Sequence, residues 1–240
     1  PFSSVMSLKD FVIYFPAIFG SLTVLPIFLL VRRLTDNKVG ALASIFFAIS
    51  VPFIQRGLAG WFKSEPLGLF YGAFGIYFFI SGVMSIFEGK KIHGIVKLAS
   101  AGLFLAFGLS AWGGVVFFFM PILAWLIMVP GMKNKLGTVV KTEIVPFFKN
   151  KKKHIPNVDS ETLPTITESK YNIKMFIVGL LVFSGVLIFV SSMFARSSAL
   201  VSSYIGLSIF LVIGFLIVEH IMSSKFKWNY FKTLIVLGII

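Results

Sequence analysis

The sequence predicts an all-α polytopic membrane protein, and three observations predict it. Apolar residues make up 57% of the 240 positions, and charged residues make up only 13%. Apolar runs of roughly 20 residues, the length of helix that crosses a bilayer, recur along the chain. Lysine and arginine gather in every second connection between these runs. This composition excludes a water-soluble globule.

The apolar runs predict seven spans and the beginning of an eighth. The runs lie at 11–31, 39–54, 67–87, 95–109, 115–129, 176–194 and 201–218, and the eighth opens near Phe231. Several runs are nearer 15 residues than 20, so flanking Gly, Ser and Ala complete them. Pro16 and Pro26 in the first run, and Pro121 in the fifth, predict kinks rather than breaks, because neighbouring helices can satisfy the freed carbonyls. Residues 1–240 are therefore expected to form one transmembrane helical domain.

The connecting segments orient these spans. Of the 22 lysines and arginines, four lie outside the basic set of connections: Lys9, Arg56, Lys63 and Arg196. Because basic loops remain on the cytoplasmic side, one orientation fits every span. It predicts a multi-pass protein of the cell membrane with residues 56–65 on the extracytoplasmic face.

The longest basic connection, 131–174, holds nine lysines and a polar run at 157–169. We expect a solvated cytoplasmic loop with a short interfacial helix around 136–148. The net charge of +13 is spread over separate short loops, which favours contact with anionic lipid and excludes a nucleic-acid surface. The chain has no cysteine, so disulfides and thiol chemistry are excluded as well.

Residues 56–65 form the candidate functional segment. Arg56, Gly60, Lys63 and Glu65 fall in one outward turn that closes at Pro66, which suits the first turn of the next helix. Ionisable groups at a membrane boundary are costly to desolvate and mark functional sites. The helix macrodipole favours an ionised glutamate at such a helix start, where it could bind a divalent cation. The alternative is a capping glutamate beside an arginine that reaches the lipid headgroups.

Three further elements follow this segment in order. The motifs are Arg56-Gly57-Leu58-Ala59-Gly60-Trp61-Phe62-Lys63-Ser64-Glu65, Lys90-Lys91, Ala111-Trp112-Gly113-Gly114 and Phe194-Ala195-Arg196-Ser197-Ser198. Their order and sidedness resemble the catalytic subunit of oligosaccharyltransferases, and the lysine- and phenylalanine-rich character resembles an archaeal-type, dolichyl-phosphooligosaccharide-dependent member. The resemblance implies part of a GT-C type multi-span transmembrane domain.

The resemblance also implies an activity and a site. The activity is protein N-glycosylation, the transfer of a glycan from a lipid-linked (polyprenyl or dolichyl phosphate) oligosaccharide to asparagine in an Asn-x-Ser/Thr acceptor polypeptide, helped by Mg or Mn. Arg56 and Glu65 would be catalytic, with Glu65 also a metal ligand. Arg196 would counter phosphate charge, Lys63 would contact substrate, and Trp112 would shape a lipid or glycan groove. An interfacial turn is the alternative for Trp112.

Two features depart from the family pattern. Most members have an aspartate where this chain has Lys63, and an ammonium group repels a metal ion placed a few ångströms away. Either Glu65 serves with carboxylates outside this chain, or Lys63 replaces the ion's charge by pairing with Glu65 or a phosphate, or the site is degenerate. Thr165-Ile166-Thr167-Glu168 repeats a family motif, but it lies in the loop predicted to be cytoplasmic, so we interpret it as chance; if genuine, Glu168 joins the site.

The resemblance places further family parts beyond both ends. The first span with its aspartate-bearing loop would precede Pro1, and the soluble domain that grips the acceptor would follow Ile240. The chain alone is therefore expected to be inactive.

Three other functions fit some of these features. Another glycosyltransferase that uses a polyprenyl-phosphate sugar would share the multi-helix architecture. A secondary transporter would explain the prolines inside spans, but no expected span has an acidic residue at its middle, and no internal repeat is visible. A structural membrane subunit without catalysis would be consistent with Lys63, which stands where most members of the family have an aspartate.

Overall fold

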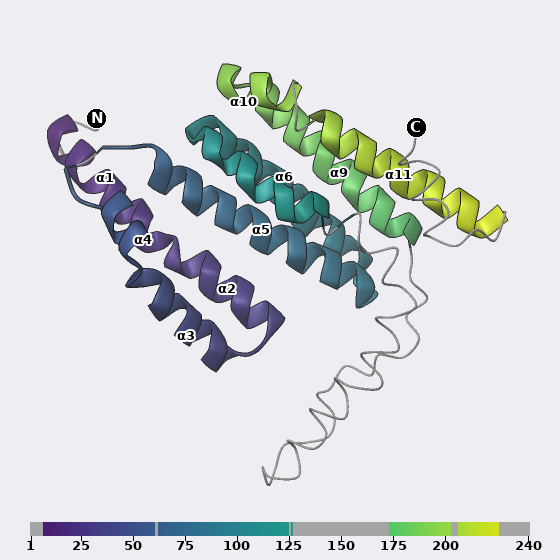
Figure 1. The fold of residues 1–240 in the computed structure, drawn as a ribbon, viewed down its shortest axis with the longest axis horizontal. Coiled ribbons are helices and arrows are strands. Elements are labelled where there is room, and N and C mark those ends of the chain that lie inside the picture. Colours follow the sequence, from purple (N-terminus) through teal and green to yellow (C-terminus); the bar gives the residue numbers. More distant parts are fainter. Residues whose placement is uncertain (1–6, 61, 125, 127–172, 203–205, 226–240) are drawn as a thin grey trace, which may run out of the picture.

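The computed structural model describes residues 7–60, 62–124, 126, 173–202 and 206–225. Within these ranges the chain is helical and contains no strand, and the helices lie side by side in an elongated bundle (Figure 1). The described residues include four helices long and apolar enough to cross a membrane: Leu8–Leu34, Glu65–Ile86, Lys91–Ala111 and Met175–Ser192. The predicted all-α, multi-span membrane fold is confirmed.

The first span is two helices in series, α1 (Leu8–Leu22) and α2 (Val24–Leu34), with a turn at Thr23. Pro26 lacks the N–H that would bind the carbonyl four residues earlier, and its ring crowds that carbonyl. The Thr23 hydroxyl donates to the Phe19 carbonyl at 2.7 Å and satisfies backbone at the irregularity. The predicted interruption of this span is therefore present.

The second expected span, 39–54, is not continuous. It forms α3 (Asn37–Ala48) and α4 (Val51–Arg56), which are separated by Ile49 and Ser50. Ser50 is extended and Pro52 occupies the first turn of α4, a position that proline suits because its missing N–H has no helical partner there. The expectation of one continuous helix was wrong at this point, because Pro52 starts a new helix.

Helices α5 (Glu65–Phe87) and α6 (Lys91–Ala111) pack tightly against each other, and α9 (Ile173–Ser192) packs against α6. Gly89, with φ of +83°, reverses the chain between α5 and α6. A Cβ at Gly102 would lie 2.5 Å from the Phe183 carbonyl oxygen of α9. Lipid supplies no hydrophobic drive for helix association, so such close backbone approach stabilises the core by van der Waals contact.

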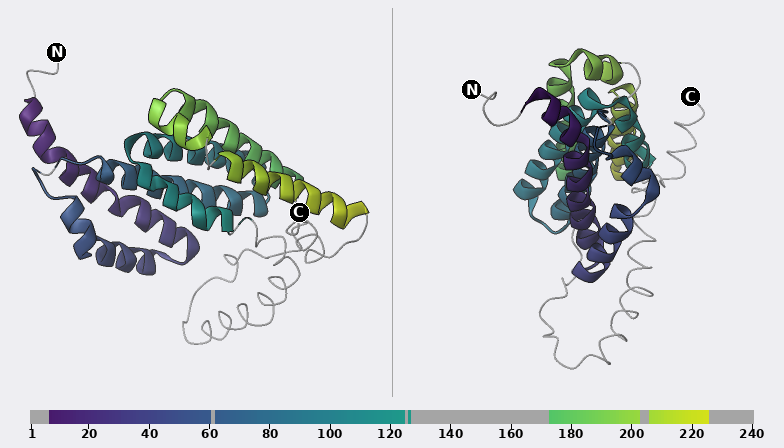
Figure 2. Two further views of the ribbon diagram at one scale, coloured as in Figure 1. Left: turned by 45° about the horizontal axis from the view of Figure 1, so that its top comes forward. Right: turned by 90° about the vertical axis from the view of Figure 1, so that its left-hand side faces the viewer.

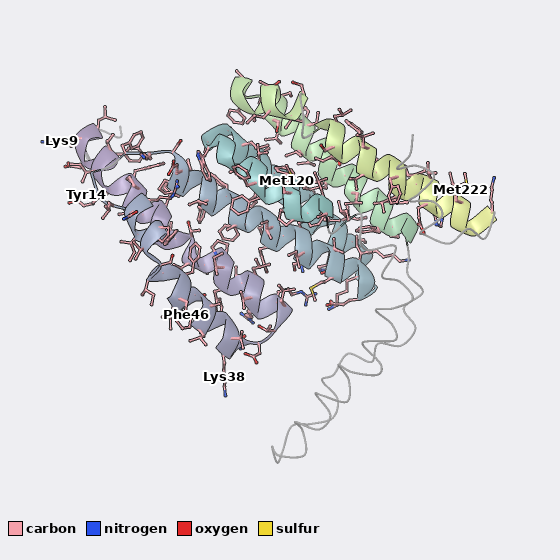
Figure 3. All side chains as sticks on the ribbon, in the orientation of Figure 1. Lys9, Tyr14, Lys38, Phe46, Met120 and Met222 are labelled. Carbon is pink, nitrogen blue, oxygen red and sulfur yellow. The ribbon has the colours of Figure 1, made fainter. Side chains whose placement is uncertain are left out.

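The core lies between these three helices and includes side chains from the helices Gly113–Ala124 and Gly206–Lys225. Its largest fully buried side chains, each under 2% exposed, are Phe79, Phe119, Phe176, Phe183, Leu98, Leu105, Leu109, Leu180, Leu187, Leu216, Val83 and Val115. Large apolar side chains on the outside remain exposed, among them Tyr14, Phe46 and Met120 (Figure 3). An apolar exterior around a packed core is expected of a bundle that is solvated by lipid.

The order of contacts shows that α6 and α9 run in the same direction. Gly179 lies against Leu98, and four residues further along each helix Phe183 lies against Gly102. The chain therefore crosses back between them, through the apolar helix Gly113–Ala124 that begins as the 3₁₀ turn η2 (Gly113–Val115). Short α10 (Ala195–Leu200) and then α11 (Gly206–Lys225), which packs on α9, complete the described bundle.

The bundle thus has two ends (Figures 1 and 2). We call one the α4–α5 end, where Arg56, Glu65 and Trp112 lie, and the other the α5–α6 end, where Arg33 and Glu88 lie. The predicted loop 131–174 with its interfacial helix, and the predicted eighth span near Phe231, fall outside the described residues.

Candidate functional site

An ion pair joins two helices at the α4–α5 end. Arg56 is the last residue of α4, Glu65 is the first residue of α5, and Nη1 of the arginine donates to Oε2 of the glutamate. The arginine side chain is 45% exposed and the glutamate side chain 22%. Pro66 follows in the first turn of α5, as the sequence predicted. The pair therefore lies at the surface of the bundle, within reach of a solvent-borne or membrane-borne group.

Trp112 lies beside this pair. The Arg56 guanidinium carbon lies over the indole, 5.9 Å from the ring centroid, a distance at which a cation is attracted to the face of tryptophan. Trp112 follows α6, and its backbone N–H donates to the Gly108 carbonyl at 2.8 Å. Three of the five predicted site residues are thus brought together from α4, from α5 and from the end of α6.

Two glycines make room for the indole. A Cβ at Gly68, in the first turn of α5, would lie 2.5 Å from the Trp112 Cβ, and one at Gly114 would lie 2.2 Å from the indole ring. Both distances are shorter than real carbon contacts, so the chain would have to shift to admit a methyl group. The Trp-Gly-Gly sequence therefore suits the close packing of the Trp112 indole between α5 on one side and η2 on the other.

The loop between α4 and α5 is held against α1 by its backbone. Gly60 adopts φ of +84°, and its N–H donates to the Ile13 carbonyl at 3.0 Å. A Cβ at Gly20 would lie 3.2 Å from the Gly57 Cα, so α1 and the loop approach closely. The Phe62 and Phe15 rings also contact each other, with centroids 5.4 Å apart.

The other two predicted residues belong to segments at the same end of the bundle. Lys63 is exposed on the loop, two positions before Glu65. Arg196 lies in α10, which packs against η2 and α6 near Trp112, and the preceding Phe194 ring contacts Phe107 of α6 at 6.0 Å. The Arg196 side chain and the Thr165–Glu168 motif lie outside what the structure describes.

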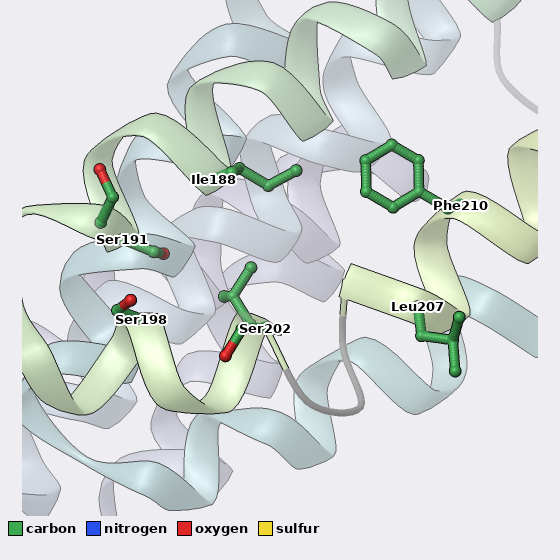
Figure 4. A pocket seen from close by; sticks show the side chains of 8 residues that line it. Ile188, Ser191, Ser198, Ser202, Leu207 and Phe210 are labelled. Atoms are coloured by element: carbon green, nitrogen blue, oxygen red, sulfur yellow. The ribbon is translucent and has the colours of Figure 1, made fainter.

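A cavity of about 330 Å³ opens between α9, α10 and α11 (Figure 4). Four serines and four apolar residues line it: Ser191, Ser192, Ser198, Ser202, Ile188, Val201, Leu207 and Phe210. The Ser191 hydroxyl is buried and has no hydrogen-bond partner. These lining residues include no ionisable side chain, so the cavity is chemically distinct from the ion pair.

The site does not form a complete metal centre from the described part of the chain. Those residues contain no group of three or more His, Cys, Asp or Glu side chains that could hold an ion. Glu65 offers one carboxylate, which is already paired with Arg56, and Mg²⁺ requires an octahedral set of oxygen ligands. Any metal ion bound here needs ligands from other residues.

Sequence reasoning missed the residues that support the site. It named neither α1, whose Ile13 carbonyl and Gly20 hold the loop, nor Gly68, which receives the indole. A signal was available for Gly68, because Gly68 and Gly72 are spaced four apart on one helix face, which is the small-residue spacing typical of close helix packing. No comparable signal pointed to Ile13, because its contact uses the backbone carbonyl, a group that every residue has.

Comparison with known proteins identifies the family of this chain. A family model described as "Oligosaccharyl transferase STT3, N-terminal" matches residues 1–239. The chain belongs to the STT3 family. The resemblance inferred from the ordered motifs is therefore confirmed, and the multi-span helical bundle is that family's GT-C type membrane domain.

Two curated STT3 proteins show how far the similarity extends. The dolichyl-diphosphooligosaccharide–protein glycosyltransferase subunit STT3 of Saccharomyces cerevisiae is 24% identical over 155 residues, which is 59% of this chain and 20% of the yeast protein. The subunit stt-3 of Caenorhabditis elegans is 26% identical over 110 residues, 46% of this chain and 14% of that protein. The chain thus matches a fifth or less of the length of these relatives. No solved structure matches it.

Proposed function

We propose that this chain belongs to a glycosyltransferase that moves an oligosaccharide from a lipid-linked donor to the asparagine of an Asn-x-Ser/Thr acceptor. The observation that carries the proposal is the convergence of Arg56, Glu65 and Trp112 at one end of an STT3-family membrane domain. Both STT3 relatives are named for transfer from a dolichyl-diphosphooligosaccharide to protein. A site at the rim of the bundle suits a donor that lies in the membrane and an acceptor that arrives from water.

The reaction needs charge of both signs. The amide nitrogen of asparagine is a poor nucleophile, and the departing lipid phosphate develops negative charge. Glu65 supplies the negative charge from the N-terminus of α5, where a negative group interacts favourably with the helix macrodipole. Arg56 is a positioning residue for Glu65, because it pairs with the carboxylate and is itself placed by the Trp112 ring.

The remaining predicted residues complete the proposed site. Arg196 of α10 and Lys63 of the loop lie at the same end and would contact the phosphate of the donor. Trp112 would border the groove for lipid or glycan. The alternation of basic connections supports an extracytoplasmic position for this end. We further propose the cell membrane as its location, and the lysine- and phenylalanine-rich composition favours an archaeal-type enzyme.

A divalent ion, Mg²⁺ or Mn²⁺, is part of the proposal for the whole protein. It would act as a Lewis acid, and Glu65 would be one of its ligands, with the others outside the described residues.

The central test replaces the two paired residues in the full-length protein. We expect Glu65→Gln and Arg56→Ala each to lower the rate of glycan transfer to an Asn-x-Ser/Thr peptide about 100-fold, the usual effect of removing one charged group from a polar active site. Lys9→Ala, an exposed cation on α1 that lies near the same end of the bundle (Figure 3), serves as the control and should transfer at the wild-type rate. Wild-type rates in both test variants would remove the pair from the mechanism.

A second test concerns the cation on the loop. Lys63→Asp places a second carboxylate two residues before Glu65, and we expect the concentration of Mn²⁺ needed for half-maximal transfer to fall, because a repelling charge becomes an attracting one. Lys63→Gln separates the loss of the cation from the gain of a carboxylate. An unchanged metal requirement and an unchanged rate in both variants would contradict a role for Lys63.

A further inference from the structure

A second group of charges lies at the α5–α6 end, away from the candidate site. Arg33 at the end of α2 pairs with Glu88, the residue that follows α5, through Nη2 and Oε1. Lys90, in the turn before α6, places Nζ 3.5 Å from Oε2 of the same glutamate. One carboxylate thus has a cation at each of its oxygens.

Lys97 adds a third cation from within a membrane span. It lies six residues into α6 from Lys91, about 9 Å along the helix. Its Nζ donates to the hydroxyls of Ser81 and Ser85 on α5, at 2.9 and 3.0 Å. Side chains on a helix lean toward its N-terminus, so the ammonium group is directed toward the α5–α6 end.

The charges of this cluster do not balance. Arg33, Lys90 and Lys97 supply three positive charges, and in the described part of the chain their ion pairs involve a single carboxylate, Glu88. Asp36, which lies between α2 and α3, accepts the Val39 N–H and caps α3. Cations beside a low-dielectric bilayer are costly without a counter-charge.

Two observations show that this excess charge is not fully compensated within the described part of the chain. The Arg33 Nε atom is buried and has no hydrogen-bond partner among the described residues, while the side chain as a whole is 29% exposed. Lys97 lies close enough to Arg33 and Lys90 for both to act on it electrostatically. An anion accepting from these cations would relieve their mutual repulsion.

Exposed apolar side chains lie at the same end. Leu34, next to Arg33, is 55% exposed, and Ile92 and Val96, on α6 before Lys97, are 77% and 59% exposed. A soluble anion gains nothing from such neighbours. A molecule that joins a phosphate to acyl chains contacts both the cations and this apolar surface.

We propose that Arg33, Lys90 and Lys97 bind the phosphate of an anionic phospholipid from the leaflet at the α5–α6 end. The lipid supplies the missing counter-charge and joins α2 to α5 and α6. This proposal does not depend on the proposed transferase activity, because it concerns the opposite end of the bundle.

The test measures retention of lipid by the full-length protein. The protein is placed in nanodiscs of phosphatidylcholine and phosphatidylglycerol, and native mass spectrometry counts the phosphatidylglycerol molecules that stay bound. We expect Lys97→Gln and Lys90→Gln each to weaken retention about fivefold, the effect of one cation near a membrane surface. Lys38→Gln, which removes an exposed lysine on α3 at the same side of the bundle (Figure 3), should retain the wild-type amount.

Three results would overturn the proposal. Equal losses of bound phosphatidylglycerol in the Lys38 and Lys97 variants would show that lipid retention depends only on the overall charge of the protein. Unchanged retention in both Lys90→Gln and Lys97→Gln would show that the cluster is purely structural. Loss of phosphatidylglycerol from the wild-type protein on addition of excess inorganic phosphate would identify a soluble anion as the ligand. Lys90 is 67% exposed, so its variant gives an answer even if the Lys97 variant fails to fold.

Discussion

Helix α5 has a glutamate at each end, and each glutamate pairs with an arginine from the helices that precede it. Glu65 pairs with Arg56 of α4, and Glu88 pairs with Arg33 of α2. Both pairs are partly exposed and both join α5 to its neighbours. They differ in the direction of the helix dipole: Glu65 lies at the positive end of α5 and Glu88 at the negative end.

This difference gives the two pairs different tasks. The macrodipole interacts favourably with the Glu65 carboxylate, in addition to the ion pair with Arg56. The macrodipole interacts unfavourably with the Glu88 carboxylate, and the ion pairs with Arg33 and Lys90 offset that interaction. Similar ion pairs at two ends of one helix thus suit chemistry at one end and structure at the other.

The largest expected effect concerns glycan transfer. Glu88→Gln should leave the rate within about twofold of wild type, whereas Glu65→Gln should lower it about 100-fold, because only Glu65 lies at the proposed reaction site. Both substitutions preserve the shape of the side chain, so the peptide-transfer assay compares charge alone. Equal losses of transfer rate in the two variants would contradict different roles for the two ends of α5.

A smaller effect is expected from the packing beside Glu65. Gly68→Ala should lower the free energy of unfolding by about 1–3 kcal/mol, because the new Cβ would overlap the Trp112 Cβ. Gly214→Ala is the matched control: that glycine of α11 has nothing within 4 Å of an added Cβ, so alanine should be neutral or stabilising there. Thermal unfolding in detergent measures the stability of both variants, and equal stability would contradict the close packing of Gly68 against Trp112.

The smallest effect tests the dipole argument directly. In an Arg56→Ala background, Glu65→Gln should still cost about 0.3–1 kcal/mol, because the favourable dipole interaction is lost. In a background that carries both Arg33→Ala and Lys90→Ala, Glu88→Gln should be neutral or stabilising, because an unfavourable dipole interaction is removed once the two paired cations are gone. The two signs can be read from the unfolding free energies of the two backgrounds and of the variants built on them. The same sign at both ends would show that the dipole does not distinguish them.

The sequence predicted the membrane fold well because apolar length and loop charge are properties of single segments. The spans at 11–31, 67–87, 95–109 and 176–194 correspond to helices of membrane-crossing length. The span at 39–54 was predicted as one helix but is broken at Ser50, because the effect of Pro52 depends on whether neighbours support the freed carbonyls.

The candidate site was predictable where it rests on short motifs. The segment containing Arg56 and Glu65, and the Trp112 motif some 50 residues later, were both chosen from the sequence, and the structure brings them together. Their actual contact could not be predicted, because it depends on α5 and α6 returning to the same end at matching lengths. The place of the loop on α1 could not be predicted either, since backbone contacts determine it.

The course of the loop is set by main-chain atoms. The Gly60 N–H bond to Ile13 and the approach of Gly57 to Gly20 involve no side chain, while Leu58 and Lys63 point outward and are exposed. The charge presented at the rim can consequently change without altering the scaffold beneath it. A membrane domain built this way can accept a lysine in place of an acid by a single substitution, and the charge at this end can evolve while the domain keeps its shape.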